Sequence, residues 1–258
     1  MSGFTAARLA PLALLASASC LLVAHVFVLN DWAGMNGDLQ DPNRAPSVFL
    51  VRGVSRAEAG WLAVALLAGS VVLFSFLGWT PLAIALGIAA ASGLYSAPVS
   101  HAKGVAPLSS MLHLAGGTLH FLLGYSLFRP FDMRGLVIGS FFGLTFMAGH
   151  FTHEARDRDG DSVNGIRTTA VRFGVRHGFV AGLIVFTAAY SLLTILALRE
   201  VVPRVLMAGA AAYPLHLAIS LRALHNGLSY ESIRRVQGCY RVLYAVLGIL
   251  MAVALVFR

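Results

Sequence analysis

The chain has few charged residues, few cysteines and almost no lysine. Only 12% of its 258 residues are charged, 11 acidic residues stand against 19 basic ones, and lysine occurs once. Soluble domains carry roughly 25% charged residues, and a chain that is 58% apolar with a mean hydropathy of +0.77 lies far from that composition. The composition excludes an ordinary soluble domain and predicts an integral membrane protein.

Cysteine usage excludes two further classes. Cys20 and Cys239 lie in or beside separate apolar runs, without the spacing of metal ligands. A disulfide framework and a zinc site are therefore not expected. The first apolar run passes directly into Asn30 and Asp31 without a small-residue cleavage site, so a cleavable signal peptide is not predicted either.

Long apolar runs fill most of the chain. A membrane-spanning helix needs ~20 apolar residues, and eight runs approach that length. They predict an all-α bundle of about eight transmembrane helices in one domain covering residues 1–258, built from two degenerate halves, 1–128 and 129–258. The runs are 9–29, 57–77, 79–97, 108–128, 135–153, 177–198, 203–222 and 238–257.

The basic residues are concentrated in alternate loops. If four of these loops share one side of the membrane, they hold 13 of the 19 basic residues. The positive-inside rule then predicts that this side is cytoplasmic, as in a bacterial-type inner membrane. No continuous basic stripe is present, so nucleic acid is not an expected partner. The four loops are 30–56, 98–107, 154–176 and 222–241.

An acidic cluster follows the fifth apolar run. Glu154, Asp157 and Asp161 lie at positions i, i+3 and i+7, so they share one face if the preceding helix continues through them. Three like charges on one face repel unless a counter-charge is present. Hard divalent cations carrying a phosphate ligand commonly supply it. The alternative interpretation is a hydrated loop between membrane helices.

A second group of acids follows the first apolar run. Asp31, Asp38 and Asp41 occur there, and helix capping with a turn is the alternative interpretation. Both clusters are followed by basic loops, with Arg44 after the first and Arg167 after the second. This repetition indicates a degenerate internal duplication. It predicts a cage of carboxylates for Mg²⁺ and diphosphate, with basic side chains on the outer oxygens.

Lys103 and several histidines are further candidates. Lys103 follows Tyr95-Ser96-Ala-Pro98 at another helix end, where an ordinary positive-inside anchor is the alternative. In His150-Phe-Thr-His153-Glu the acid follows the histidine pair, so the segment is not a metalloprotease signature. Polar residues within apolar runs are functional candidates by default, although a histidine that is hydrogen-bonded inside a helix bundle is the commoner case. The histidines within the apolar runs are His25, His113, His120, His150 and His216.

Over nearly its whole length the sequence resembles the UbiA family of intramembrane prenyltransferases. Asn30, Asp31 and Asp38 match that family's first motif, Asn-Asp-x-x-Asp-x-x-x-Asp. The family's Tyr-Ser-x-Pro motif with a nearby lysine corresponds to Tyr95, Ser96, Pro98 and Lys103. Its second motif, Asp-x-x-Asp-x-x-x-Asp followed by Gly and Thr-x-x-Val-Arg-x-Gly, corresponds to Glu154, Asp157, Asp161, Gly165, Thr168, Val171, Arg172 and Gly174, with the threonine one place further from the valine.

The resemblance implies a helical bundle around a central cavity that is open to membrane lipid, where Mg²⁺ holds a polyprenyl diphosphate. The implied reaction is ionisation of the allylic diphosphate and attack on the carbocation by an acceptor, usually an aromatic ring. The implied catalytic residues are Asp31, Asp38, Asp157, Asp161 and Tyr95, with Tyr95 at the reacting end of the prenyl chain. The implied metal ligands are Asn30, Asp38, Glu154, Asp157 and Asp161, and the implied diphosphate ligands are Asn30, Arg44, Lys103 and Arg167.

The sequence departs from the family pattern in three ways. Gly34 occupies the place of the first motif's second aspartate, Glu154 replaces an aspartate, and no counterpart of the family's first helix is expected, because the first run corresponds to the second. Two alternatives remain open. One keeps the fold but changes the reaction to cyclisation or to transfer onto a non-aromatic acceptor, and the other is a non-catalytic isoprenoid-binding protein.

Overall fold

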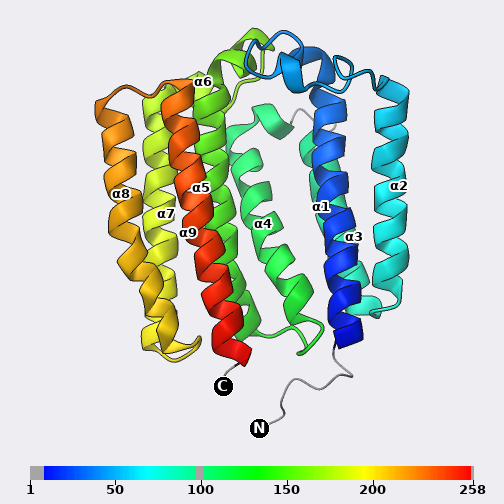
Figure 1. The fold of residues 1–258 in the computed structure, drawn as a ribbon, viewed down its shortest axis with the longest axis vertical. Coiled ribbons are helices and arrows are strands. Elements are labelled where there is room, and N and C mark those ends of the chain that lie inside the picture. Colours follow the sequence, from blue (N-terminus) through cyan, green and yellow to red (C-terminus); the bar gives the residue numbers. More distant parts are fainter. Residues whose placement is uncertain (1–8, 97–101, 257–258) are drawn as a thin grey trace. The chain divides into compact units, whose positions relative to one another are not determined.

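The computed structural model describes residues 9–96 and 102–256, and it contains helices and no strand within those ranges (Figure 1). The all-α prediction is confirmed. The α-helices are α1 (Leu9–Asp38), α2 (Arg56–Ser75), α3 (Trp79–Ser96), α4 (Ala106–Tyr125), α5 (Met133–Val163), α6 (Thr169–Phe173), α7 (Val175–Leu198), α8 (Ala208–His225) and α9 (Tyr230–Val256), with short 3₁₀ turns at Ala45–Ser47, Ala102–Gly104 and Arg204–Met207.

Each predicted apolar run lies on a long helix, but three helices extend well beyond the predicted runs: α1 and α5 at their C-terminal ends, and α9 at its N-terminal end. Helix α1 continues to Asp38 and α5 to Val163, so Asp31, Asp38 and all three acids of the second cluster lie on the C-terminal turns of these helices, whereas Asp41 follows α1. Hydropathy ends a span where polar residues begin, whereas the helical hydrogen bonds continue into water. Seven of the described helices are long and apolar enough to cross a membrane. Helix α4, with 20 residues, is not among them because serines and histidines interrupt it.

Local sequence signals explain several helix ends. Ser55 and Glu58 form a reciprocal capping box at the start of α2, which satisfies two otherwise unpaired N–H groups. Thr168 caps the one-turn helix α6 through the backbone N–H of Val171. Gly174 ends that helix with a φ of 93°, a conformation that favours glycine. The Thr-to-Gly part of the second motif therefore forms a capped turn.

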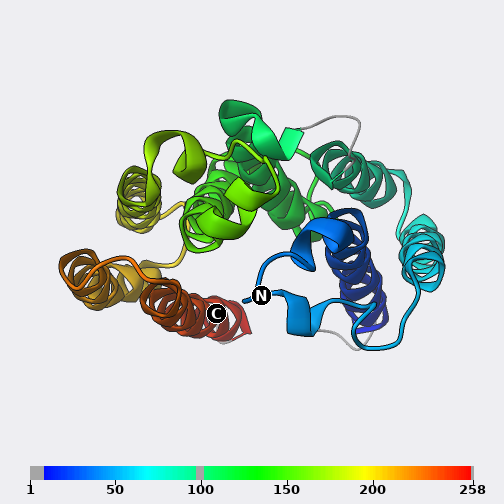
Figure 2. The same cartoon turned by 90° about the horizontal axis from the view of Figure 1, so that it is seen from above.

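The described chain forms two compact units, and the division falls within α4 and α5. The first unit contains α1, α2 and α3, which all contact one another and can be followed in blue, cyan and teal in Figure 2. Its core includes Leu22, Phe74 and Ile88. His25 is buried there, and its Nδ1 lies 2.8 Å from the carbonyl of Ala63. This histidine is satisfied within the bundle, as the commoner interpretation predicted.

The second unit contains α6, α7, α8 and α9, most of α5 and residues 113–118 of α4. Its core is rich in aromatic rings, including Phe179, Phe186 and Tyr240, and the rings of Phe186 and Tyr240 are 4.9 Å apart. A cavity of about 150 Å³ lies between α5 and α9, a volume that admits a benzene-sized molecule. Its lining is apolar and includes Phe141, Phe142, Phe146, Tyr244, Leu247 and Met251.

Candidate active site

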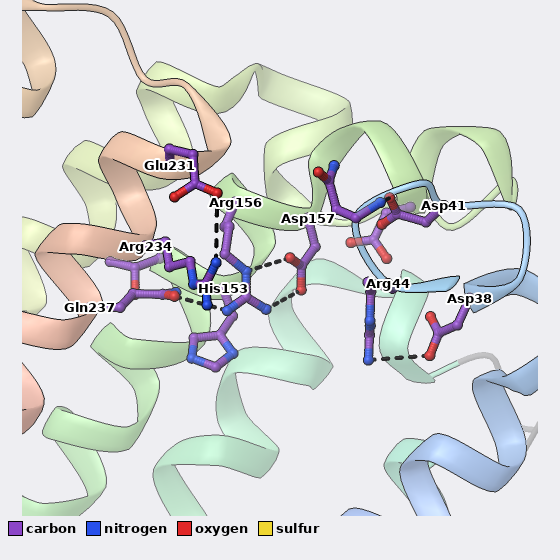
Figure 3. A network of polar contacts seen from close by, with 12 residues as sticks. Asp38, Asp41, Arg44, His153, Arg156, Asp157, Glu231, Arg234 and Gln237 are labelled. Atoms are coloured by element: carbon purple, nitrogen blue, oxygen red, sulfur yellow. Dashed lines mark hydrogen bonds and ion pairs between the residues drawn. The ribbon is translucent and has the colours of Figure 1, made fainter. Parts of the chain in front are cut away.

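In the first unit, Arg44 joins two acids of the first cluster. Its Nη2 lies 3.2 Å from Asp38 Oδ2 and 3.8 Å from Asp31 Oδ1, and Figure 3 shows the pair with Asp38. The Asp38 side chain is 16% exposed, while that of Asp31 is 48% exposed. A predicted diphosphate ligand therefore neutralises two predicted catalytic carboxylates.

The only lysine is paired in the same way. Lys103 Nζ lies 3.1 Å from Asp161 Oδ1, and the Asp161 side chain is only 6% exposed. The backbone N–H of Arg167 lies 3.5 Å from the position that a side chain on Gly104 would take. The loop before α4 and the end of α5 therefore meet at an ion pair in which the carboxylate is buried and the Lys103 side chain is 30% exposed. Lys103 is more than a surface anchor, because its partner is a buried carboxylate.

A second set of contacts attaches the end of α5 to the end of α1. The Asn164 amide donates to the carbonyl oxygens of Gly37, at 3.1 Å, and Gly160, at 2.8 Å. Asp41 is 5% exposed and accepts a hydrogen bond from the backbone N–H of Asn43 at 2.9 Å. A methyl group on Gly160 would lie 2.4 Å from an Asp41 oxygen. Asp41 therefore serves a buried turn. Sequence analysis missed Asn164 and Gly160, whose partners are more than 100 positions away.

The remaining predicted site residues of the first unit are Asn30, Tyr95 and Arg167. Asn30 lies on α1 and Tyr95 near the end of α3, both half-buried, whereas Arg167 is exposed. Pro98 lies outside the described residues. The first unit thus brings together Asp31 with Asp38 and Arg44, and separately Lys103 with Asp161.

In the second unit, Glu154 is buried and both of its oxygens have partners. Oε1 lies 3.0 Å from His150 Nε2, and Oε2 accepts the Thr169 N–H at 3.0 Å. The His150 ring stacks on that of His113, with 3.8 Å between centroids. Glu154 therefore connects α5 to the first residue of α6. The contacts explain why a longer glutamate side chain is accommodated at this motif position.

Asp157 is also bound by a basic side chain. Arg156 Nε and Nη2 donate to its two oxygens at 2.5 and 2.7 Å, and Arg156 Nη1 donates to Gln237 Oε1 on α9 at 2.8 Å (Figure 3). Sequence analysis singled out neither Arg156 nor Gln237. Within each unit, the acids of the family motifs are thus held by cations or by N–H donors. No group of three or more potential metal ligands occurs among the described residues.

Comparisons with known proteins agree with this architecture. The model of the UbiA prenyltransferase family matches residues 2–233. A comparison with curated protein sequences finds no match.

Solved structures of similar fold share little sequence with the chain. A UbiA homologue from Archaeoglobus fulgidus bound to GPP and Mg²⁺ has a TM-score of 0.68 and 17% identity, covering 95% of this chain and 88% of that one. The same homologue bound to DMAPP and Mg²⁺ gives a TM-score of 0.66 at 17% identity, with the same coverage. A digeranylgeranylglyceryl phosphate synthase structure gives 0.66 at 16% identity, covering 95% of this chain and 86% of that one.

Proposed function

Because the chain belongs to the UbiA prenyltransferase family, we propose that it transfers a prenyl group from a polyprenyl diphosphate to a hydrophobic, aromatic acceptor within the membrane. The observation that carries the proposal is the pairing of Arg44 with Asp38 and of Lys103 with Asp161. In each pair, a basic side chain that can bind phosphate oxygens contacts a carboxylate that can bind a divalent cation. A substrate made of a metal ion and a diphosphate offers a phosphate oxygen to the base and a cation to the acid.

The donor set fits Mg²⁺. Mg²⁺ keeps several waters and is usually bound by one or two carboxylates together with substrate phosphates, so a preformed cage of three protein ligands is not required. We assign Asp38 and Asp161 to this role in the first unit, with Asn30 and Asp31 beside Asp38. Asp157 and Glu154 are assigned to it from their places in the second motif. When bound, Mg²⁺ neutralises charge on the leaving diphosphate.

The remaining roles follow from charge and polarity. Arg44, Lys103 and Arg167 provide cations for the outer diphosphate oxygens, and Arg44 and Lys103 exchange a carboxylate for a phosphate partner when the substrate arrives. Tyr95 is assigned to the reacting end of the prenyl chain. The apolar cavity beside Phe142 and Phe146 suits a hydrocarbon segment, because it offers that segment no polar partner.

The reaction is tested by product analysis. Lipid extracts from cells with and without the gene are compared by liquid chromatography and mass spectrometry. We expect a lipid whose mass equals an acceptor plus whole prenyl units, present only when the gene is present. A cyclised hydrocarbon with no acceptor added would favour a cyclase instead, and identical extracts would count against both reactions.

Position 34 tests the metal assignment in the first cluster. A side chain on Gly34 would begin 3.4 Å from Asp38 Oδ2, which is an ordinary contact distance. Gly34→Asp should therefore place an additional carboxylate next to Asp38 and lower the Mg²⁺ concentration needed for half-maximal diphosphate release by several-fold. Gly34→Asn, similar in size but uncharged, is the control and should have a smaller effect. Equal Mg²⁺ curves for all three proteins would show that position 34 does not face the metal.

Membrane orientation is proposed from charge, with the active-site loops on the cytoplasmic side of an inner-type membrane. Contacts within the first unit join the ends of α1 and α5 and the loop before α4. Arg52, Val105 and Val163 are exposed in these regions. Single cysteines at the three positions, in a Cys20→Ser, Cys239→Ser background, should resist impermeant maleimide in intact cells and react after permeabilisation. Labelling of any one in intact cells would contradict the orientation.

A further inference from the structure

The Arg156–Asp157 pair has an unusual geometry for neighbouring residues of a helix. Side chains at i and i+1 of an α-helix point in directions about 100° apart and do not normally face each other. Arg156 nevertheless places two nitrogens on the two oxygens of Asp157, at 2.5 and 2.7 Å. The guanidinium therefore folds sideways across the helix surface, and a contact from outside α5 helps to keep it there.

That contact comes from α9. Gln237 Oε1 accepts a hydrogen bond from Arg156 Nη1 at 2.8 Å, and Gln237 is only 1% exposed. The ring of Tyr230, the first residue of α9, has its centroid 5.7 Å from Arg156 Cζ, within the range of a cation–π contact. Figure 3 shows the Gln237 amide and the Asp157 carboxylate on opposite sides of the Arg156 guanidinium.

The rigidity of this arrangement follows from burial and shape. The Arg156 and Asp157 side chains are 17% and 13% exposed, so water competes weakly for their hydrogen bonds. A planar guanidinium bound by a two-oxygen fork and fixed at its third nitrogen has little rotational freedom. The position of the Asp157 carboxylate is thereby determined by a residue on another helix.

We propose that Gln237 is a positioning residue that acts through Arg156 to orient the Asp157 carboxylate for the metal–diphosphate complex. The inference rests on the proposed function, because it takes Asp157 as a metal ligand. Partners that orient metal ligands typically contribute 10- to 100-fold to metal affinity. Gln237 should therefore influence metal binding without touching the metal or the substrate.

The test measures Mn²⁺ binding by electron paramagnetic resonance. Purified protein in nanodiscs is titrated with Mn²⁺ in the presence of an unreactive thiodiphosphate analogue of an allylic substrate, so the readout does not depend on turnover. Gln237→Leu, which removes the acceptor but keeps the bulk, should weaken Mn²⁺ binding about 10-fold. Gln237→Glu keeps an acceptor oxygen for Arg156 and should bind Mn²⁺ within about three-fold of wild type.

Two further variants complete the design. Tyr240→Phe, one turn along α9, removes a 3.1 Å buried hydrogen bond to Thr152 and should leave Mn²⁺ affinity unchanged, which controls for a general loss of α9 packing. Gln237→Asn shortens the arm by one methylene and replaces the leucine variant if that protein does not fold. Wild-type Mn²⁺ affinity in a folded Gln237→Leu or Gln237→Asn protein would overturn the inference.

A double-mutant cycle separates positioning from independent effects. If Gln237 acts through Arg156, then Gln237→Leu should add little to the loss already caused by Arg156→Gln. Full additivity of the two losses would overturn the inference. Asp157→Asn distinguishes the inference from its premise: wild-type Mn²⁺ affinity in that variant would remove Asp157 from the metal site, and the proposed role of Gln237 would fall with it.

Discussion

Replacing Asp157 by asparagine should lower turnover by ~100-fold or more in a protein that still folds. Asparagine has nearly the same size, so no cavity forms. It can accept only one of the two hydrogen bonds that Arg156 donates to Asp157, so we expect a modest decrease in the midpoint of thermal unfolding. What is lost is a negative charge at a proposed metal ligand. The measurement is steady-state diphosphate release alongside thermal unfolding in the same detergent.

Asp159 provides the matched control for this substitution. It lies two positions further along α5, is exposed, and belongs to no family motif. Asp159→Asn removes the same charge from the same helix and should retain turnover within a few-fold of wild type. Equal losses in both variants would indicate a general effect of acidic charge, and full activity of Asp157→Asn would remove Asp157 from the active site.

The second large effect is expected from Gly117 on α4, in the second unit. A methyl group there would lie 2.7 Å from the Phe142 carbonyl oxygen and 2.9 Å from Gly143 Cα on α5. Since both of these atoms belong to backbone, the helices themselves would have to separate. Gly117→Ala should destabilise the protein by about 1–3 kcal/mol, the usual range for overpacking, and should lower the midpoint of thermal unfolding.

The neighbouring glycine serves as the control. A methyl group on Gly116 meets no atom within 4 Å, so Gly116→Ala should be neutral or slightly stabilising, because alanine favours helix more than glycine. Both variants can be compared by size-exclusion chromatography after heating. If the two alanine variants unfold at the same temperature, α4 does not pack closely on α5 at Gly117.

Much of the fold was predictable because a membrane imposes a simple rule on sequence. A span needs ~20 apolar residues with its backbone hydrogen bonds satisfied internally, and every predicted run has its helix. The ends of α1 and α5 were not predictable by that rule. Hydropathy stops at Leu29 and His153, whereas the helices continue to Asp38 and Val163, where polar side chains find partners outside the apolar layer.

The candidate site was predictable in identity but not in arrangement. Motif spacing pointed to Asp38 and Asp161 as metal ligands and to Arg44 and Lys103 as phosphate ligands, assignments that stay predictions. It gave no indication that these acids and bases pair with each other, because the pairings depend on how the loops fold. Gln237 lies 81 positions from Arg156, and no sequence signal names the partner of a single glutamine just before an apolar run.

Gly34 illustrates what the structure adds to a motif. The family pattern has an aspartate at position 34, where this chain has a glycine. Asp41 lies buried in a turn against Gly160, whereas position 34 faces Asp38 across one helical turn. The first cluster therefore has room at position 34 for a carboxylate one turn before Asp38, in addition to Asp31, but carries a glycine there. We expect its metal affinity to depend heavily on Asp38 and on the phosphate oxygens of the substrate.

The most direct test of the central claim is diphosphate release by the purified protein from an allylic diphosphate, titrated with Mg²⁺. Farnesyl and geranylgeranyl diphosphates with phenolic and quinol-type acceptors are suitable substrates. We predict release that requires Mg²⁺, is abolished by a chelator and restored by excess Mg²⁺, and is lost in Asp38→Asn. Release that is equally fast without divalent metal, or no release from a folded protein with any of these substrates, would contradict the account.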